Sequence, residues 1–209
     1  MIPPKELVII GAGGLAAEII EAAELAGWRV TKLYDDNPAM LSREVLGRKC
    51  YGIIDAFERS STTSYHIAIG RNDVRQKLGV RLSNVGHQEI TVIHPNAIVS
   101  RAARIGQGTY IGAGAFVSPD VQVGSYSIIN VGATIGHNAT LGNWVQICPG
   151  ARISGFGVLG DGVFIGSNAV VGPGMALGEW SKLGASSFAA RNVPAHNLAV
   201  GIPARIITQ

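Results

Sequence analysis

The chain has few cysteines, little charge and no long apolar run, and each shortage excludes a class of protein. Its two cysteines, Cys50 and Cys148, stand far apart, which argues against a disulfide framework or a zinc cluster. Charged residues make up 15% of the chain, and the net charge of +3 comes from scattered basic residues, which argues against nucleic-acid binding. Without a signal peptide or a run of eighteen apolar residues, we expect a soluble, cytoplasmic protein with no membrane span and no metal.

Aliphatic residues recur at every sixth position from Ile93 to Phe188. Sixteen consecutive hexads in this stretch each begin with Ile, Val or Leu, and no residue is inserted. A period of six fits neither a helix nor an alternating strand, but it is typical of a parallel β-helix, in which three hexads form one triangular coil. The pattern predicts a prism of about five coils, with each leading aliphatic residue stacked on the one eighteen residues away.

Two further hexad positions have a marked composition. The fifth position is mostly small or aliphatic, as at Ala115, Ala133 and Val145, and is expected to share the interior. Glycine often holds the second position, as at Gly136 and Gly142. There we expect a corner that needs either unusual backbone dihedral angles or a close approach of two backbones.

The first third of the chain has a different, non-repeating pattern. The predicted elements are strands over 5–10, 29–34 and 66–70, a helix from the Gly-rich turn to Gly27, and a helix over 72–82. Alternation of strands and helices predicts a small α/β unit with a parallel, Rossmann-like sheet over residues 1–88. The β-helix would then occupy residues 89–209.

The Gly-rich turn after the first strand is a candidate anion site. Backbone N–H groups at a helix start attract phosphate, and Gly13 and Gly14 stand at that place. Glu18 replaces the third glycine of a dinucleotide motif, so the sequence also fits a tight turn without a ligand. Asp35 and Asp36 end the second strand, where an acid can contact a ribose or base, although ordinary turn chemistry explains them equally well.

Five stretches, taken in order, resemble the bacterial sugar acetyltransferases of the sialic-acid and nucleotide 4-amino-sugar pathways. They are VIIGAGGLAAEII, LYDDNP, IAIGRNDVR, the hexads around IGHNAT, and VPAHNLAVGIPAR, and together they cover nearly the whole chain. The resemblance implies a nucleotide-sugar-binding domain joined to a left-handed β-helix, acetyl-CoA as co-substrate, and a homotrimer with coenzyme A between adjacent prisms. It also implies that the nucleotide sugar contacts Gly13, Gly14, Leu15, Asp35, Asp36 and Gly70. Many relatives have His in place of Leu15.

Five histidines compete for a catalytic role. Of these, His66 and His94 are expected to be structural, His87 to be solvated, and His196 to belong to the C-terminal cap. His137 is the third residue of the hexad IGHNAT, a position that points out of the prism, and Gly155, eighteen residues on, would leave an open notch beside it. The resemblance makes His137 the general base that deprotonates the attacking amine, in direct transfer without a Ser or Cys nucleophile.

Asn138 departs from the pattern of close relatives, which have an acid after the histidine. Asparagine can orient an imidazole but cannot neutralise an imidazolium, so either another acid acts, such as one from a neighbouring subunit, or the base is weaker. By resemblance, Gln146, Ser167 and Ala185 line the acetyl-CoA groove, and a backbone N–H near Gly155 stabilises the oxyanion.

Three functions fit these observations. The first is an acetyl-CoA-dependent N-acetyltransferase that acts on the amine of a nucleotide-linked 4-amino-sugar. The second is an O-acetyltransferase for sialic acid or another sugar, because a hydroxyl and an amine need the same base. The third is an inert hexapeptide scaffold that binds a sugar nucleotide. The exposed His137 and the separate Gly-rich domain favour an enzyme.

Overall fold

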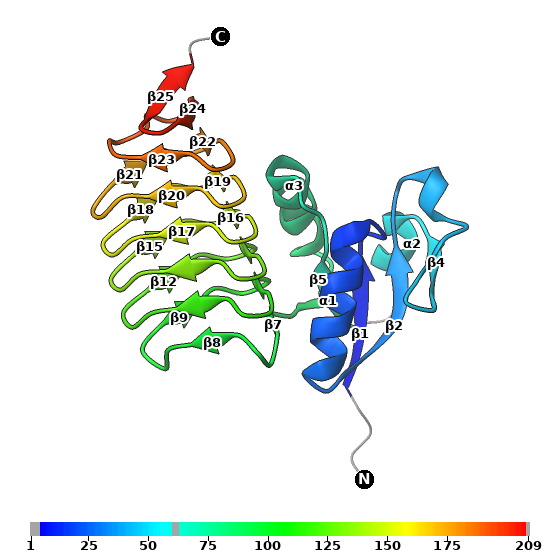
Figure 1. The fold of residues 1–209 in the computed structure, drawn as a ribbon. Coiled ribbons are helices and arrows are strands. Elements are labelled where there is room, and N and C mark those ends of the chain that lie inside the picture. The colour runs from blue at the N-terminus through cyan, green and yellow to red at the C-terminus, as the bar shows by residue number, and fades with distance from the viewer. Residues whose placement is uncertain (1–4, 60–62, 208–209) are drawn as a thin grey trace. The chain divides into compact units, whose positions relative to one another are not determined.

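The computed structural model describes residues 5–59 and 63–207, and the chain divides into two compact units, residues 1–95 and 96–209. The first unit is built on a sheet with the strand order β3-β4-β2-β1-β5-β6, in which β4, β2, β1, β5 and β6 run parallel (Figure 1). The strands are β1 (Lys5–Ile10), β2 (Trp28–Tyr34), β3 (Glu44–Val45), β4 (Arg48–Gly52), β5 (Ser64–Ile67) and β6 (Gln88–Glu89). The predicted boundary after residue 88 stays a prediction.

Three α-helices and one short 3-10 turn connect these strands. They are α1 (Gly14–Leu25), α2 (Ile54–Glu58), α3 (Asn72–Leu82) and the turn η1 (Pro38–Met40). Helix α1 buries an apolar face that includes Ile19, Ile20 and Ala23. Ala26 is exposed because the helix ends before it, and Gly27 follows with a φ of +89°.

The second unit is a prism of two-residue strands spaced six residues apart (Figure 1). The first strand of the series, β7 (Val92–Ile93), precedes the boundary at residue 95. The β14 face holds β8 (Ile98–Val99), β11 (Phe116–Val117), β14 (Thr134–Ile135), β17 (Arg152–Ile153), β20 (Val170–Val171) and β23 (Phe188–Ala189). The β15 face holds β9 (Arg104–Ile105), β12 (Gln122–Val123), β15 (Thr140–Leu141), β18 (Val158–Leu159) and β21 (Ala176–Leu177). The β16 face holds β10 (Tyr110–Ile111), β13 (Ile128–Ile129), β16 (Gln146–Ile147), β19 (Phe164–Ile165) and β22 (Lys182–Leu183), followed by β24 (Leu198–Gly201) and β25 (Ala204–Ile207).

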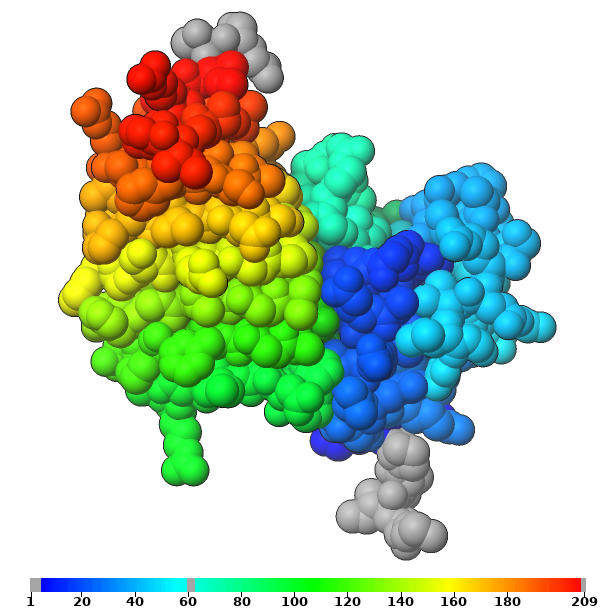
Figure 2. Space-filling view, viewed as in Figure 1, coloured from blue at the N-terminus to red at the C-terminus, as the bar shows by residue number. Residues whose placement is uncertain are grey.

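The core of the prism follows the predicted spacing. Val117, Ile135, Ile153 and Val171 pair in parallel at intervals of eighteen residues and are almost fully buried. The fifth positions, such as Ala133, are buried as well. The leading residues of the first coil are only half-buried, because each has a stacking neighbour on one side only. Successive coils lie in continuous contact on the face seen in Figure 2.

The corners of the prism show why glycine holds the second hexad position. A Cβ on Gly136 would lie 2.5 Å from the backbone nitrogen of Gly155, so close approach, not unusual dihedral angles, requires glycine there. The left-handed conformation falls instead at the fourth position, where φ lies between 55° and 70° in every hexad from 105 to 188. These residues are Gly108, Gly114, Asp120, Tyr126, Gly132, Asn138, Trp144, Gly150, Phe156, Gly162, Asn168, Gly174, Trp180 and Ser186.

Candidate functional site

His137 lies at the corner that joins the β14 face to the β15 face, which we name the histidine corner. At the third hexad position, successive coils place Pro119, His137, Gly155 and Pro173 along this corner. The His137 side chain is exposed, as predicted. The backbone around it is fixed by coil-to-coil bonds, since Phe156 N–H donates to the His137 carbonyl at 2.9 Å.

The His137 ring lies directly against Gly155. A Cβ on Gly155 would be 2.9 Å from both Cε1 and Nε2 of the imidazole, closer than two such atoms can approach. The predicted open notch is therefore filled by the imidazole itself. Phe156 packs edge-on against the ring, with centroids 5.1 Å apart and an interplanar angle of 90°. Gly155 and Phe156 together hold the ring in one place, and no pattern in the sequence indicates the part played by Phe156.

Asn138 sets which ring nitrogen of His137 is free. Nδ1 lies 3.0 Å from Oδ1 of Asn138. A carboxamide oxygen only accepts hydrogen bonds, so Nδ1 must carry the hydrogen and donate it. In the neutral imidazole the lone pair then lies on Nε2, which is the nitrogen able to take a proton. Asn138 has a φ of +59°, a conformation that asparagine tolerates well.

The residues predicted to bind acetyl-CoA lie elsewhere on the prism. Ser167 and Ala185 stack at the corner between the β16 and β14 faces, where Ser186 N–H donates to the Ser167 carbonyl at 2.8 Å. Gln146 is half-buried on the β16 face. Within one chain, therefore, these three residues do not meet at the histidine corner, and only Gly155 does. Their role stays a prediction.

Cys148 is the cysteine of the prism, and it is not a candidate nucleophile. Burial raises the pKa of its thiol to about 11, so the thiol stays protonated at neutral pH. The thiolate is the reactive form of cysteine, which makes a covalent acyl-cysteine route through this residue unfavourable.

In the first unit, three loops meet at the carboxyl ends of β1, β2 and β5. Gly11 N–H donates to the Tyr34 carbonyl at 2.7 Å, and Ala68 N–H donates to the Ile10 carbonyl at 2.8 Å. Gly11 has a φ of +112°, and a Cβ there would lie 2.8 Å from the Ala68 carbonyl oxygen. Chain order reverses at β1, which has β2 on one side and β5 on the other. Open α/β sheets bind ligands at such a switch point.

These loops bring the predicted nucleotide-sugar residues together. Gly13, Gly14 and Leu15 begin α1, and Gly13, at the helix N-cap, supplies no side-chain cap. Gly70 lies in the loop between β5 and α3. Arg75, which is 1% exposed, holds that loop by donating to the carbonyls of Ile69 and Gly70 at 2.9 and 3.1 Å. Burial lowers the pKa of the Arg75 guanidinium to about 9.

Asp35 and Asp36 have different surroundings. Asp35 accepts hydrogen bonds from the N–H groups of Ala12 and Asn37, both at 2.8 Å, so each of its carboxylate oxygens is occupied. Asp36 is exposed and accepts one hydrogen bond, from Ile54 N–H to Oδ1 at 2.9 Å. Its Oδ2 makes no hydrogen bond with any residue that the structure describes. Asp35 therefore shapes the turn, and Asp36 has an oxygen available for a ligand.

The other histidines have surroundings that differ partly from expectation. His66 is buried, with Nδ1 2.7 Å from the Ile90 carbonyl, and is structural as predicted. His87 was expected to be solvated, but its ring packs at a tilt against that of Phe57 in α2, with centroids 4.3 Å apart and an interplanar angle of 31°. His196 is exposed, and its Nε2 lies 3.8 Å from Oε1 of Glu179.

Within residues 5–59 and 63–207, no group of three or more His, Cys, Asp or Glu side chains is arranged to hold a metal ion. The helices of this described part are all too short or too polar to span a membrane.

A β-helix of hexapeptide repeats with an exposed histidine at one corner, preceded by an α/β unit with a Gly-rich turn, defines a class of acyltransferases. The PglD N-terminal domain family matches residues 6–82. PerB from Caulobacter crescentus, solved with CoA and GDP-perosamine, is 34% identical over 100% of this chain and 99% of its own, with a TM-score of 0.92. The PglB acetyltransferase domain of Neisseria gonorrhoeae FA1090 is 28% identical over 97% of this chain and 100% of its own, with a TM-score of 0.92.

Among curated relatives, UDP-N-acetylbacillosamine N-acetyltransferase of Bacillus subtilis (strain 168) is 53% identical over 45 residues. The curated relatives are matched over only 24% and 21% of their own lengths. The match to PerB, in contrast, spans both chains almost completely. The chain belongs to the bacterial sugar N-acetyltransferase family, and the predicted fold, an α/β domain followed by a left-handed parallel β-helix, is confirmed.

Proposed function

We propose that the protein transfers the acetyl group of acetyl-CoA to the amine of a nucleotide-linked 4-amino-sugar, with His137 as the general base. The observation that carries the proposal is the His137 ring, exposed at the histidine corner and held between Gly155, Phe156 and Asn138 with Nε2 free. A solved GDP-perosamine N-acetyltransferase from Caulobacter crescentus, 33% identical to this chain, was obtained with CoA and GDP-perosamine. This relative supports both proposed substrate classes.

The chemistry follows from the nitrogen that is free. The sugar amine attacks the thioester carbonyl, a C–N bond forms, and Nε2 of His137 takes the proton that the amine loses. The tetrahedral intermediate collapses as the C–S bond breaks. The proton on His137 then returns to the sulfur of the leaving coenzyme A. Backbone N–H groups near Gly155 are the candidate donors to the oxyanion.

In this proposal the first unit binds the nucleotide part of the sugar substrate. The N–H groups at the start of α1, around Gly13, Gly14 and Leu15, face the phosphates. Asp36 and the Gly70 loop face the nucleoside. The convergence of these loops at the switch point of the sheet supports this part of the proposal.

We also propose that the working form is a homotrimer in which acetyl-CoA lies between adjacent prisms. Ser167 and Ala185 lie at a different corner from His137, so a groove that uses all three needs a second prism. Exposed apolar side chains on and beside the β14 face support such a contact, because large exposed apolar patches mark interfaces. They are Ile98 (62% exposed), Phe116 (42%), Phe156 (58%) and Val158 (49%). The cytoplasm, where acetyl-CoA is made, is the proposed location.

The test of this function is acetyl transfer from acetyl-CoA to UDP-, GDP- and dTDP-linked 4-amino-sugars, followed by mass spectrometry of the products. We expect one of them to gain a single acetyl group on nitrogen. The matched control is the same nucleotide sugar with a hydroxyl at position 4. Preferred acetylation of that hydroxyl would show that the protein is an O-acetyltransferase. Binding of the nucleotide sugars without turnover of any of them would support the inert scaffold. A monomer in light scattering at working concentration would exclude the shared groove.

A further inference from the structure

Helix α2 is short and depends on its neighbours. It has five residues, Ile54–Glu58, and a helix of this length is not stable by itself in water. Phe57 anchors it from below: its side chain is fully buried, and its ring centroid lies 5.6 Å from that of Tyr34 and 5.5 Å from that of Tyr65. This contact fixes how deep the helix lies. Ile54, in the first turn, is buried as well, and these two apolar contacts leave the polar side of the helix, with Asp55 and Glu58, to be held by other contacts.

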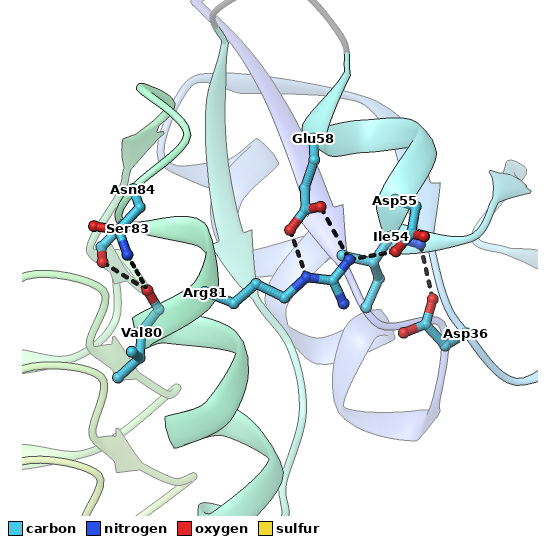
Figure 3. Close-up of polar contacts among 8 residues, drawn as sticks. All are labelled: Asp36, Ile54, Asp55, Glu58, Val80, Arg81, Ser83 and Asn84. Carbon is cyan, nitrogen blue, oxygen red and sulfur yellow. Dashed lines mark hydrogen bonds and ion pairs between the residues drawn. The ribbon is translucent and has the colours of Figure 1, made fainter.

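Arg81 of α3 supplies those contacts (Figure 3). Its Nε donates to Oε1 of Glu58 at 2.5 Å, and its Nη2 donates to Oε2 of Glu58 at 3.0 Å and also to Oδ1 of Asp55. Asp55 and Glu58 are three residues apart and therefore lie on the same side of α2. One planar guanidinium holds both carboxylates, and their hydrogen bonds, that of Glu58 most, raise the pKa of Arg81 above its ordinary value.

The end of α3 that carries Arg81 is itself fixed. The Val80 carbonyl accepts hydrogen bonds from Ser83 Oγ at 2.9 Å and from Asn84 Nδ2 at 3.2 Å. These bonds cap the last turn of the helix (Figure 3). The start of α3 holds the Gly70 loop through Arg75. One helix therefore braces both sides of the proposed nucleoside site, Gly70 through Arg75 and α2 through Arg81.

The first N–H group of α2 connects the helix that Arg81 holds to the Asp36 carboxylate. Ile54 N–H donates to Oδ1 of Asp36, and Ile54 directly precedes Asp55, which Arg81 holds. We propose that Arg81 is a positioning residue for nucleoside binding: it fixes α2, α2 fixes the Asp36 carboxylate, and Oδ2 of Asp36 accepts a hydrogen bond from an N–H or O–H group of the nucleoside. This inference rests on the proposed function, in which the first unit binds a nucleotide sugar.

The test is isothermal titration calorimetry of the full-length protein with UDP, GDP and dTDP. For the nucleotide that binds best to the wild type, we expect Arg81→Gln to weaken binding roughly threefold to tenfold, the usual range for one hydrogen bond out of place. Arg81→Lys should recover only part of the affinity, because an ammonium cannot hold three oxygens in a fixed plane. Arg29→Gln is the matched control: Arg29 pairs with Glu6, also 23 residues away in sequence, between β1 and β2. Its affinity should equal that of the wild type.

A double-mutant cycle separates positioning from a general loss of structure. If Arg81 acts through Asp36, then Arg81→Gln should have no further effect in an Asp36→Asn background. In turnover assays it should raise KM for the sugar nucleotide and leave kcat and KM for acetyl-CoA unchanged. Glu58→Gln, which removes one half of the clamp, should give a smaller effect in the same direction.

Two outcomes would overturn the inference, and they are distinguishable. Wild type that binds none of the three nucleotides would refute the proposed nucleotide site and this inference with it. Wild type that binds, with Arg81→Gln losing the same factor in both backgrounds or losing nothing, would refute the positioning role alone.

Discussion

The two units of this protein hold their functional groups in place by different means. At the histidine corner, repeated backbone bonds and glycine contacts set the position of His137. In the first unit, side chains bonded to backbone groups do this work, as Asp35, Asp36 and Arg75 show. The buried histidine, arginine and glutamate side chains among the described residues, His66, Arg75, Glu89 and His94, all lie in the first unit. We therefore expect the stability of the first unit to depend on pH and the stability of the prism to depend on local packing.

The largest expected effect is at His137. His137→Ala should lower kcat by about 10²–10⁴-fold, the range for loss of a general base. Its thermal unfolding should match wild type, because the side chain is exposed and holds no coil together. His196→Ala is the control, since His196 is equally exposed on the prism but lies beside Glu179. Near-wild-type turnover of His137→Ala would show that another residue acts as the general base.

Gly155 offers a change that separates activity from stability. In Gly155→Ala the new Cβ would meet a side chain, the His137 ring, at 2.9 Å, so the ring must move. We expect kcat to fall roughly tenfold to a hundredfold, because a misplacement of this size disrupts the attack geometry, with unfolding little changed. In Gly166→Ala the Cβ would meet the backbone nitrogen of Ala185 at 2.5 Å, which cannot move cheaply. That variant should lose stability, by about 1–3 kcal/mol. A loss of stability in Gly155→Ala, with a loss of kcat alone in Gly166→Ala, would contradict this assignment.

Two buried groups should make the first unit sensitive to pH. Burial raises the pKa of Glu89 to about 8 and lowers the pKa of His66 to about 4. Between pH 4.5 and 6.5 the two effects cancel: the folded state keeps the Glu89 proton and the unfolded state binds the His66 proton. From pH 6.5 to 8 only the folded state holds a proton, so the unfolding free energy should fall as pH rises, by roughly 2 kcal/mol. Below pH 4.5 it should fall again as pH decreases.

The measurement is denaturant unfolding followed by tryptophan fluorescence. Trp28 reports on the first unit, and Trp144 and Trp180 report on the prism. Glu89→Gln, which has no proton to lose, should remove the loss between pH 6.5 and 8 for the Trp28 transition only. A prism transition that shifts equally with pH would show that the two units do not differ in this respect.

The smallest expected effect concerns the hydrogen bond from His137 to Asn138. Asn138→Gly keeps the left-handed backbone without strain and removes only Oδ1, so kcat should fall by about twofold to tenfold, the worth of one hydrogen bond. Asn168→Gly is the matched control, since Asn168 has the same hexad position and a φ of +57° at another corner. A comparable loss of kcat in both variants would mean that Asn138 acts through the backbone and not through the imidazole.

Much of the prism could be predicted from the sequence because its contacts repeat. A period of six fixes which residue stacks on which, and so places Gly155 over His137 without further knowledge. What the spacing could not give is the orientation of the ring, which fills the notch expected to be open. The left-handed conformation at the fourth position was also hidden, because residues as different as Trp144, Phe156 and Gly162 adopt it.

The first unit was less predictable beyond its elements. The helix over 72–82 was predicted with the bounds that the structure has, because local propensity determines it. The partners of its side chains depend on distances between elements far apart in sequence, and no pattern in the chain encodes them. Arg75 and Arg81 were missed for this reason, and His87 was expected to be solvated because nothing in the sequence places Phe57 over it.

The left-handed residue recurs at every sixth position, and three hexads form one coil. Only a change in length by whole coils therefore keeps each side chain at its own corner. Insertion or removal of eighteen residues before His137 would return every side chain to its own corner and move the histidine along the axis by one strand spacing, about 4.8 Å. Insertion of six residues would instead carry His137, with Gly155 still stacked on it, to the next corner, where the imidazole would point in another direction. The height of the imidazole above the first coil is thus adjustable by evolution or by design in discrete steps, while its direction is fixed.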